Sequence, residues 1–142
     1  MEEQEELRVE PWMRGVLLLA GTYNIGWGFF IFNFPESFYQ WVSQSEMAVP
    51  SIISWQGIGV LFFGLLYLAI AIYPSKLVYL LLVGIASKLI GAAWFYWFVM
   101  EGEATKQFLF HLIMNDLVWI PPFAVVFIRI LKVRLVKYQL KT

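Results

Sequence analysis

The sequence predicts an all-α integral membrane protein, an antiparallel four-helix bundle with both termini in the cytoplasm. Its 142 residues are 61% hydrophobic, 19% aromatic and only 14% charged, which is too apolar for a soluble domain of this size. Four apolar runs are each long enough to cross a bilayer, because about 20 helical residues span a hydrocarbon core of roughly 30 Å. Short connections between the runs favour antiparallel neighbours. The predicted spans cover residues 14–34, 52–73, 77–99 and 108–129.

Three regions are expected along the chain: an acidic N-terminal arm (1–10), a four-span membrane domain (11–130) and a basic cytoplasmic tail (131–142). The arm carries five glutamates and no apolar period, so we expect it to be solvated. Basic residues predict the orientation, since cytoplasmic segments are enriched in Lys and Arg. Only Lys106 falls on the far side of this four-span arrangement. The near side holds Arg8, Arg14, Lys76, Arg129, Lys132, Arg134, Lys137 and Lys141.

The first span has a face of small residues. Gly21, Asn24 and Gly28 are three and four residues apart, which allows a second helix to approach closely, with Asn24 as a polar tie. We expect a retained helix and not a cleaved signal peptide, because the apolar stretch is long and no small-residue cleavage site follows. Pro35 ends this span. The aromatic segment 38–42 then predicts a short interfacial helix in the outer headgroup region, which could roof a pocket.

The second and third spans each combine glycines with a polar residue. Two glycines share one face of the second span, and Gln56 lies in its outer half. In the third span Gly84 and Gly91 flank Lys88 on one face, which admits a neighbouring helix or a ligand. An aromatic cluster that begins at Trp94 ends this span and is typical of an interfacial belt.

The fourth span is the most polar. His111 and Asn115 share a face, Asp116 follows directly, and Trp119 lies one turn beyond. Pro121-Pro122 then removes two amide donors, so we expect carbonyls one turn earlier to lack helical partners. Interrupted membrane helices occur where the backbone lines a cavity or is buried against protein. A simple kink filled by packing is the alternative interpretation.

Lys88 and Asp116 lie near the middle of adjacent apolar runs, so they are expected to pair. An unpaired charge at membrane depth costs at least about 2.5 to 3.5 kcal/mol. The pair either ties two helices together and sets their register, or serves a site that holds a polar head group or transfers protons. Residues 80–83 and 125–128 are all apolar, so no polar residue continues the site toward the cytoplasm. We therefore expect a blind pocket, closed on the cytoplasmic side and open outward. The candidate ligand-binding residues are Lys88, Asp116, Asn115, His111, Asn24, Gln56, Trp119 and Trp94.

Composition and motifs exclude several classes of chemistry. The chain has no cysteine, which removes disulfides, thiolate metal sites, iron–sulfur clusters and c-type haem, and its single histidine excludes a bis-histidine haem. One imidazole and one carboxylate, from His111 and Asp116, fall short of a usual metal-ligand set, so no metal is expected. No nucleotide-binding loop, nucleophile elbow or nucleic-acid motif occurs, so no nucleic-acid partner is expected.

Several residues carry a resemblance to a known group. Tyr23-Asn24 followed by Trp27-Gly28, Pro35 after the first span, and Lys88 and Asp116 in the later spans resemble the small bacterial four-span proteins grouped around the DoxX-like families. The resemblance runs over nearly the whole membrane part. It implies a bacterial inner (cytoplasmic) membrane protein in a group of which some members are linked to quinone-coupled oxidation. It identifies no catalytic residue.

Three functions stay open at this point. The first is a binding or accessory protein that holds a quinone, an isoprenoid or another lipid near Lys88 and Asp116, as a subunit of a larger membrane complex or a homo-oligomer. The second is a membrane enzyme that uses Lys88, Asp116 and His111 as acid and base groups on such a ligand. The third is a proton-coupled small-molecule transporter, which would need a second polar route to the cytoplasm.

Overall fold

The computed structural model describes residues 9–99 and 103–139, and within these ranges all regular secondary structure is helical. The N-terminal arm predicted for residues 1–10 lies almost wholly outside the described residues, as do the last three residues of the tail. In chain order the elements are α2 (Pro11–Asn33), α3 (Pro35–Ser43), α4 (Ile52–Ile72), α5 (Pro74–Leu77), α6 (Leu80–Phe98), α7 (Lys106–Asn115), the 3-10 helix η1 (Leu117–Trp119) and α8 (Ile120–Gln139).

Among the described residues, three helices are long and apolar enough to cross a membrane: α2, α4 and α6. They coincide with the first three predicted spans to within three residues at each end. The predicted fourth span, 108–129, is not one helix, because α7 ends at Asn115 and α8 begins only at Ile120. The basic tail continues α8 as helix to Gln139, as the sequence indicated.

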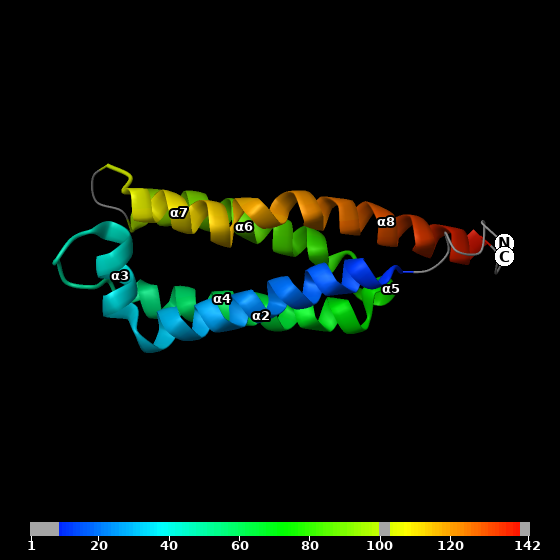
Figure 1. Cartoon of the computed structure of the whole chain (residues 1–142), viewed down its shortest axis with the longest axis horizontal. Coiled ribbons are helices and arrows are strands. Elements are labelled where there is room, and N and C mark those ends of the chain that lie inside the picture. The colour runs from blue at the N-terminus through cyan, green and yellow to red at the C-terminus, as the bar shows by residue number, and fades with distance from the viewer. Residues whose placement is uncertain (1–8, 100–102, 140–142) are drawn as a thin grey trace.

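The helices form two layers (Figure 1). One layer is the antiparallel pair of α2 and α4, and the other consists of α6 beside α7 and α8. The start of α2 and the end of α8 lie at one end of the molecule, near α5, whereas α3 lies at the opposite end. Consecutive long segments therefore run in opposite directions, as the short connections predicted.

Glycines bring α2 and α4 into backbone contact. A Cβ added at Gly28 would lie 2.6 Å from the amide nitrogen of Leu61, and one added at Gly57 would lie 2.6 Å from that of Phe32. Real Cβ atoms do not approach so closely, so only glycine permits this helix spacing. The close-packed face predicted in the first two spans is confirmed.

Two buried apolar clusters hold the layers together, one at each end. The termini-end cluster lies near α5 and contains Met13, Leu17, Ala20, Tyr67, Ile70, Ala71, Val78, Leu81, Phe123, Val126 and Ile130. The α3-end cluster contains Ile31, Phe38, Tyr39, Val42, Ile53, Phe95, Val99 and Phe108. Both clusters draw residues from both layers, so each layer buries one apolar face against the other.

The outward faces of the long helices are apolar as well. Large side chains such as Phe29, Trp55, Phe62, Ile90 and Trp97 are each more than half exposed. A water-soluble protein rarely shows so much apolar surface, whereas a lipid-facing surface requires it. The exposed surface thus agrees with the three candidate spans in assigning the protein to the membrane.

The short helix expected after the first span is present as α3. It begins at Pro35, whose missing amide is tolerated in the first turn of a helix, and ends at Gln44 in the left-handed conformation with a φ of 54°. Phe38 on α3 is fully buried, with its ring 5.2 Å from that of His111. This helix therefore covers the end of the bundle opposite the termini.

Arg14 ties the start of α2 to the end of α4. Its guanidinium donates hydrogen bonds to the carbonyl oxygens of Ala71 and Ile72, at 3.0 and 3.3 Å. These carbonyls belong to the last turn of α4, which has no further helical amides to bond. A cation at a helix C-terminus also matches the helix dipole.

Candidate functional site

The break between α7 and α8 lies in the turn before the prolines, where the sequence predicted it. Pro121 and Pro122 occupy the first turn of α8, where a missing amide costs no helical hydrogen bond. The α-helix is interrupted before them by η1, where the amide of Ile120 donates to the carbonyl of Leu117. The carbonyl of Leu117 therefore has no α-helical partner at Pro121, as predicted, and the tighter 3-10 turn supplies the amide of Ile120 instead.

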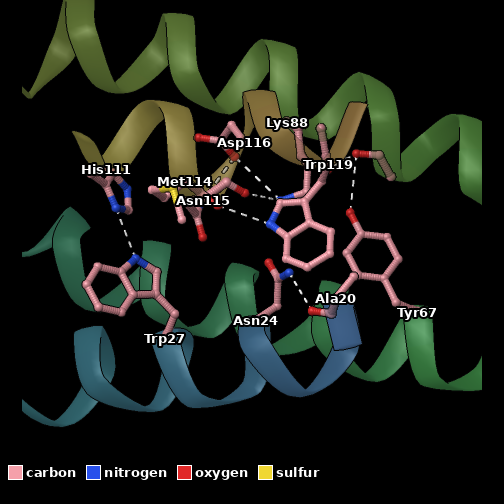
Figure 2. A network of polar contacts seen from close by, with 12 residues as sticks. Ala20, Asn24, Trp27, Tyr67, Lys88, His111, Met114, Asn115, Asp116 and Trp119 are labelled. Atoms are coloured by element: carbon pink, nitrogen blue, oxygen red, sulfur yellow. Dashed lines mark hydrogen bonds and ion pairs between the residues drawn. The ribbon is translucent and has the colours of Figure 1, made fainter. Parts of the chain in front are cut away.

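Side chains bond the carbonyls at the end of α7. The Lys88 ammonium donates to the carbonyl oxygen of Asn115 at 2.5 Å, and the Trp119 indole donates to that of Met114 at 3.1 Å. In a continuous α-helix the amide of Trp119 would bond Asn115, but here it bonds the carbonyl of Asp116 at 3.3 Å. Figure 2 shows both side chains reaching this turn. Lys88 thus replaces an amide donor at the C-terminus of α7.

Lys88 and Asp116 form the ion pair that the sequence predicted. The ammonium nitrogen lies 3.6 Å from Oδ1 of Asp116, and the two side chains are 4% and 13% exposed. This distance is too long for a hydrogen bond, so the attraction is electrostatic. The same Oδ1 accepts a hydrogen bond from the Asn115 amide at 3.1 Å. Lys88 is therefore held by a carbonyl and a carboxylate from one short turn.

A cavity of about 200 Å³ lies beside this turn, between α4 and α6 and over α7. Seven of the eight predicted ligand-binding residues line it, whereas Trp119 does not; the ring of Trp119 packs on Tyr23 and Phe123. The predicted residues in the lining are Asn24, Gln56, Lys88, Trp94, His111, Asn115 and Asp116. The remaining lining residues are Gly59, Val60, Phe63, Tyr67, Ser87, Gly91, Ala92, Phe95, Phe108 and Leu112.

Apart from Gln56, the α4 residues of the cavity wall were not predicted, although their spacing in the sequence indicates them. Gly59, Phe63 and Tyr67 follow Gln56 at spacings of three and four, so they lie on the same helical face. Extending the face from the one polar residue would have found them. Tyr67 also reaches the other layer, where its hydroxyl lies 3.4 Å from the carbonyl of Gly84 (Figure 2).

The cavity differs from the expected outward-opening pocket. The buried rings of Phe38, Phe95 and Phe108 lie at the α3 end, and the termini-end cluster lies on the other side. By contrast, a Cβ added at Gly59 or Gly91 would meet no atom within 4 Å, and Gly91 is exposed. The free space is thus at two lining glycines, Gly59 of α4 and Gly91 of α6, which indicates an opening between these two helices.

Two buried oxygens in the cavity wall have no hydrogen-bond partner. They are Oδ1 of Asn115 and Oε1 of Gln56. The orientation of the Asn115 amide is determined by its surroundings, because its nitrogen must face the carboxylate of Asp116, which only accepts. The Asn115 oxygen is therefore the free atom. A buried acceptor without a donor is unusual and requires an explanation.

His111 is held by Trp27, which was not among the predicted ligand-binding residues. The indole of Trp27 donates to Nδ1 of His111 at 3.0 Å, across the two layers (Figure 2). Because an indole nitrogen is only a donor, Nδ1 must be unprotonated in this bond, which leaves Nε2 as the N–H nitrogen. The spacing of residues 27 and 111 in the sequence carries no signal of this contact.

The described residues contain no group of three His, Cys, Asp or Glu side chains able to hold a metal ion. The chemistry of the site is therefore that of one cation, one carboxylate, one imidazole and several amides around an aromatic-walled space. Comparison of the chain with protein-family models, curated proteins and solved structures found no match. The fold and the site define an all-helical membrane protein with a buried ion pair beside an interior cavity.

Proposed function

We propose that this protein crosses the membrane four times and binds a lipophilic molecule, with its polar end in the cavity beside Lys88, Asn115 and Asp116. The observation that carries the proposal is the cavity itself, which is lined by charged groups, amides and aromatic rings and has open space at two lining glycines, Gly59 and Gly91. Few convergent polar groups in an otherwise apolar pocket are typical of a small-molecule site.

The fourth crossing is supported by length and polarity. Residues 106–129, from the start of α7 to Arg129, cover about 36 Å at a helical rise of about 1.5 Å, which is enough for a hydrocarbon core of roughly 30 Å. Within this segment the charge of Asp116 is paired with Lys88 and turned inward. Basic side chains gather at the end with the termini, and this supports a cytoplasmic location for that end by the positive-inside rule.

The volume limits what enters. A cavity of about 150 Å³ accepts benzene, so about 200 Å³ suits one substituted six-membered ring or a compact head group and excludes a whole lipid. A tail would leave through the opening at Gly59 and Gly91 and lie along the apolar outer faces of α4 and α6. Quinones, isoprenoids and other single-headed lipids have this shape.

The cellular setting follows from the resemblance noted in the sequence. We place the protein in a bacterial inner membrane, close to the DoxX-like group, as a ligand-binding accessory subunit of a larger membrane complex or a homo-oligomer. This setting accounts for the small size of the bundle, whose long helices expose many large apolar side chains that can meet lipids or partner helices.

Native mass spectrometry tests the proposal. The wild-type protein, purified gently in a mild detergent, should carry a lipophilic adduct. Gly91→Leu should lose the adduct, because the larger side chain fills the opening. Gly26→Leu is the matched control, since Gly26 is exposed, has open space at its Cβ position and lies outside the cavity lining. Equal adduct in both variants would contradict the proposed site.

A further inference from the structure

In the cavity wall, several hydrogen-bond donors have partners within the protein, whereas two acceptors have none. Several donors already have protein acceptors: the Asn24 amide bonds the carbonyl of Ala20 at 2.8 Å, and the Ser87 hydroxyl bonds that of Gly84 at 2.8 Å. The Lys88 ammonium bonds Asn115, as described above. Two acceptor oxygens, in contrast, have no donor. The wall therefore contains two unused acceptors, in addition to the Nε2–H donor of His111.

The Asn115 oxygen is the better defined of the two acceptors. Asn115 is 4% exposed and its side chain points from α7 toward the layer of α2 and α4 (Figure 2). Its amide cannot turn around without placing an oxygen against the carboxylate of Asp116. Gln56, on α4, supplies the second unpartnered oxygen. The two acceptors come from opposite layers, and the residues that carry them line one cavity.

From this arrangement we infer that the bound molecule carries a hydrogen-bond donor at its polar end, and that it is a hydroxylated ring such as a phenol or hydroquinone, not its ether or quinone counterpart. The inference rests on the proposed function and specifies its ligand. A hydroxyl satisfies the Asn115 oxygen by donating to it. An ether or a quinone carbonyl only accepts, so it would leave that oxygen buried and unpaired.

The ring is inferred from the walls and the volume. Phe63, Trp94, Phe95 and Phe108 contribute aromatic surface to the lining, and such rings favour stacked or edge contacts with another ring. The volume of about 200 Å³ leaves room for one ring with small substituents. The hydroxyl at one end and a tail at the opening then define the orientation of the molecule.

The experiment compares two matched probes, 4-decylphenol and 4-decylanisole, which differ only in a methyl group on the phenolic oxygen. Binding to the detergent-purified protein is measured at equilibrium and corrected for partition of each probe into micelles. We expect the phenol to bind the wild-type protein about tenfold to a hundredfold more tightly than the ether, the difference made by one unpaired buried acceptor.

Two variants locate the acceptor. Asn115→Leu has a similar volume without the oxygen and should bring the two affinities together. Gln56→Leu should reduce the preference as well, and it disturbs no contact of the ion pair, so it serves if Asn115→Leu fails to fold. A phenol preference that survives in both folded variants would overturn the assignment of the acceptors.

The possible failures are distinguishable. Equal binding of the two probes to the wild type, lost in Gly91→Leu but kept in Gly26→Leu, would overturn the donor inference and leave the proposed function standing. No binding of either probe, together with no lipophilic adduct on the purified protein, would contradict the proposed function itself.

Discussion

Lys88 donates a 2.5 Å hydrogen bond to the main-chain carbonyl of Asn115, the last residue of α7, so a side chain on one helix completes the end of another. The nearby carboxylate of Asp116 balances the charge that this bond brings into the interior. The pair is thus more than a contact between two charges, because it also holds the chain at the turn that faces the cavity. Structural and ligand-binding roles meet in the same residues.

Lys88→Met should destabilise the protein strongly. It leaves the Asp116 carboxylate buried without a cation and the Asn115 carbonyl without its donor, and removing one partner of a buried pair typically costs about 3 to 5 kcal/mol. The double variant Lys88→Met with Asp116→Leu should recover most of this loss, since two apolar side chains need no pairing. Thermal unfolding in detergent, monitored by circular dichroism, measures the stability of both variants.

Lys132→Met is the matched control for this series, because Lys132 is exposed on α8. Its unfolding temperature should equal that of the wild type. If Lys88→Met unfolded at the wild-type temperature too, neither the bond from Lys88 to the Asn115 carbonyl nor the ion pair would contribute to stability, contrary to this interpretation.

Gly28→Ala and Gly57→Ala should each destabilise the α2 and α4 pair. The added Cβ would lie 2.6 Å from a backbone nitrogen of the facing helix, so the helices must separate, at a cost of about 1 to 3 kcal/mol. Gly59→Ala is the control, because its Cβ meets no atom within 4 Å and alanine favours helix over glycine. The free energy of unfolding of Gly59→Ala should be unchanged or higher. If Gly59→Ala lost as much free energy of unfolding as Gly57→Ala, the helix spacing would not be the cause of the destabilisation.

Arg14→Met should loosen the last turn of α4. The change removes two hydrogen bonds to the carbonyls of Ala71 and Ile72 and should cost about 1 to 2 kcal/mol. Arg129→Met removes the exposed pair with Glu10 and should cost about 0 to 1 kcal/mol. Hydrogen exchange at the end of α4 measures the difference. Equal protection of these amides from exchange in the two variants would argue against a stabilising role of Arg14 at the end of α4.

The four-span topology predicts a labelling pattern. The chain has no cysteine, so single substitutions report without background. A membrane-impermeant maleimide added to intact cells should label Gln44→Cys and Glu103→Cys, at the α3 end, but not Tyr138→Cys on α8. Permeabilised cells should label all three. Labelling of Glu103→Cys and Tyr138→Cys from the same side would mean that the segment from α7 to α8 does not cross.

Much of the fold could be predicted because the bilayer imposes simple constraints. Apolar length located α2, α4 and α6, and glycine spacing located the close contact at Gly28 and Gly57. The pairing of Lys88 with Asp116 followed from the cost of an isolated charge at membrane depth. These rules need only the residue types and their spacing along one helix.

The details of the site depend on contacts between helices and could not be predicted in the same way. Proline content indicated a break before Pro121, but it did not indicate that the prolines lie in the first turn of a new helix, α8, or that the 3-10 turn η1 bonds the carbonyl of Leu117. The bond from Trp27 to His111 and the sideways opening at Gly91 depend on how the two layers are spaced. Helical periodicity describes one helix and carries no information on that spacing.

The amount of lipophilic adduct on the double variant Lys88→Met with Asp116→Leu tests the central claim most directly. Native mass spectrometry compares it with the wild type and with Lys132→Met, after circular dichroism has shown that all three are folded. If the polar end of the ligand lies at Lys88 and Asp116, the folded double variant should retain less than about one tenth of the adduct, as expected for the loss of about 1.4 kcal/mol or more of binding energy. Full retention of the adduct by the folded double variant would contradict the account.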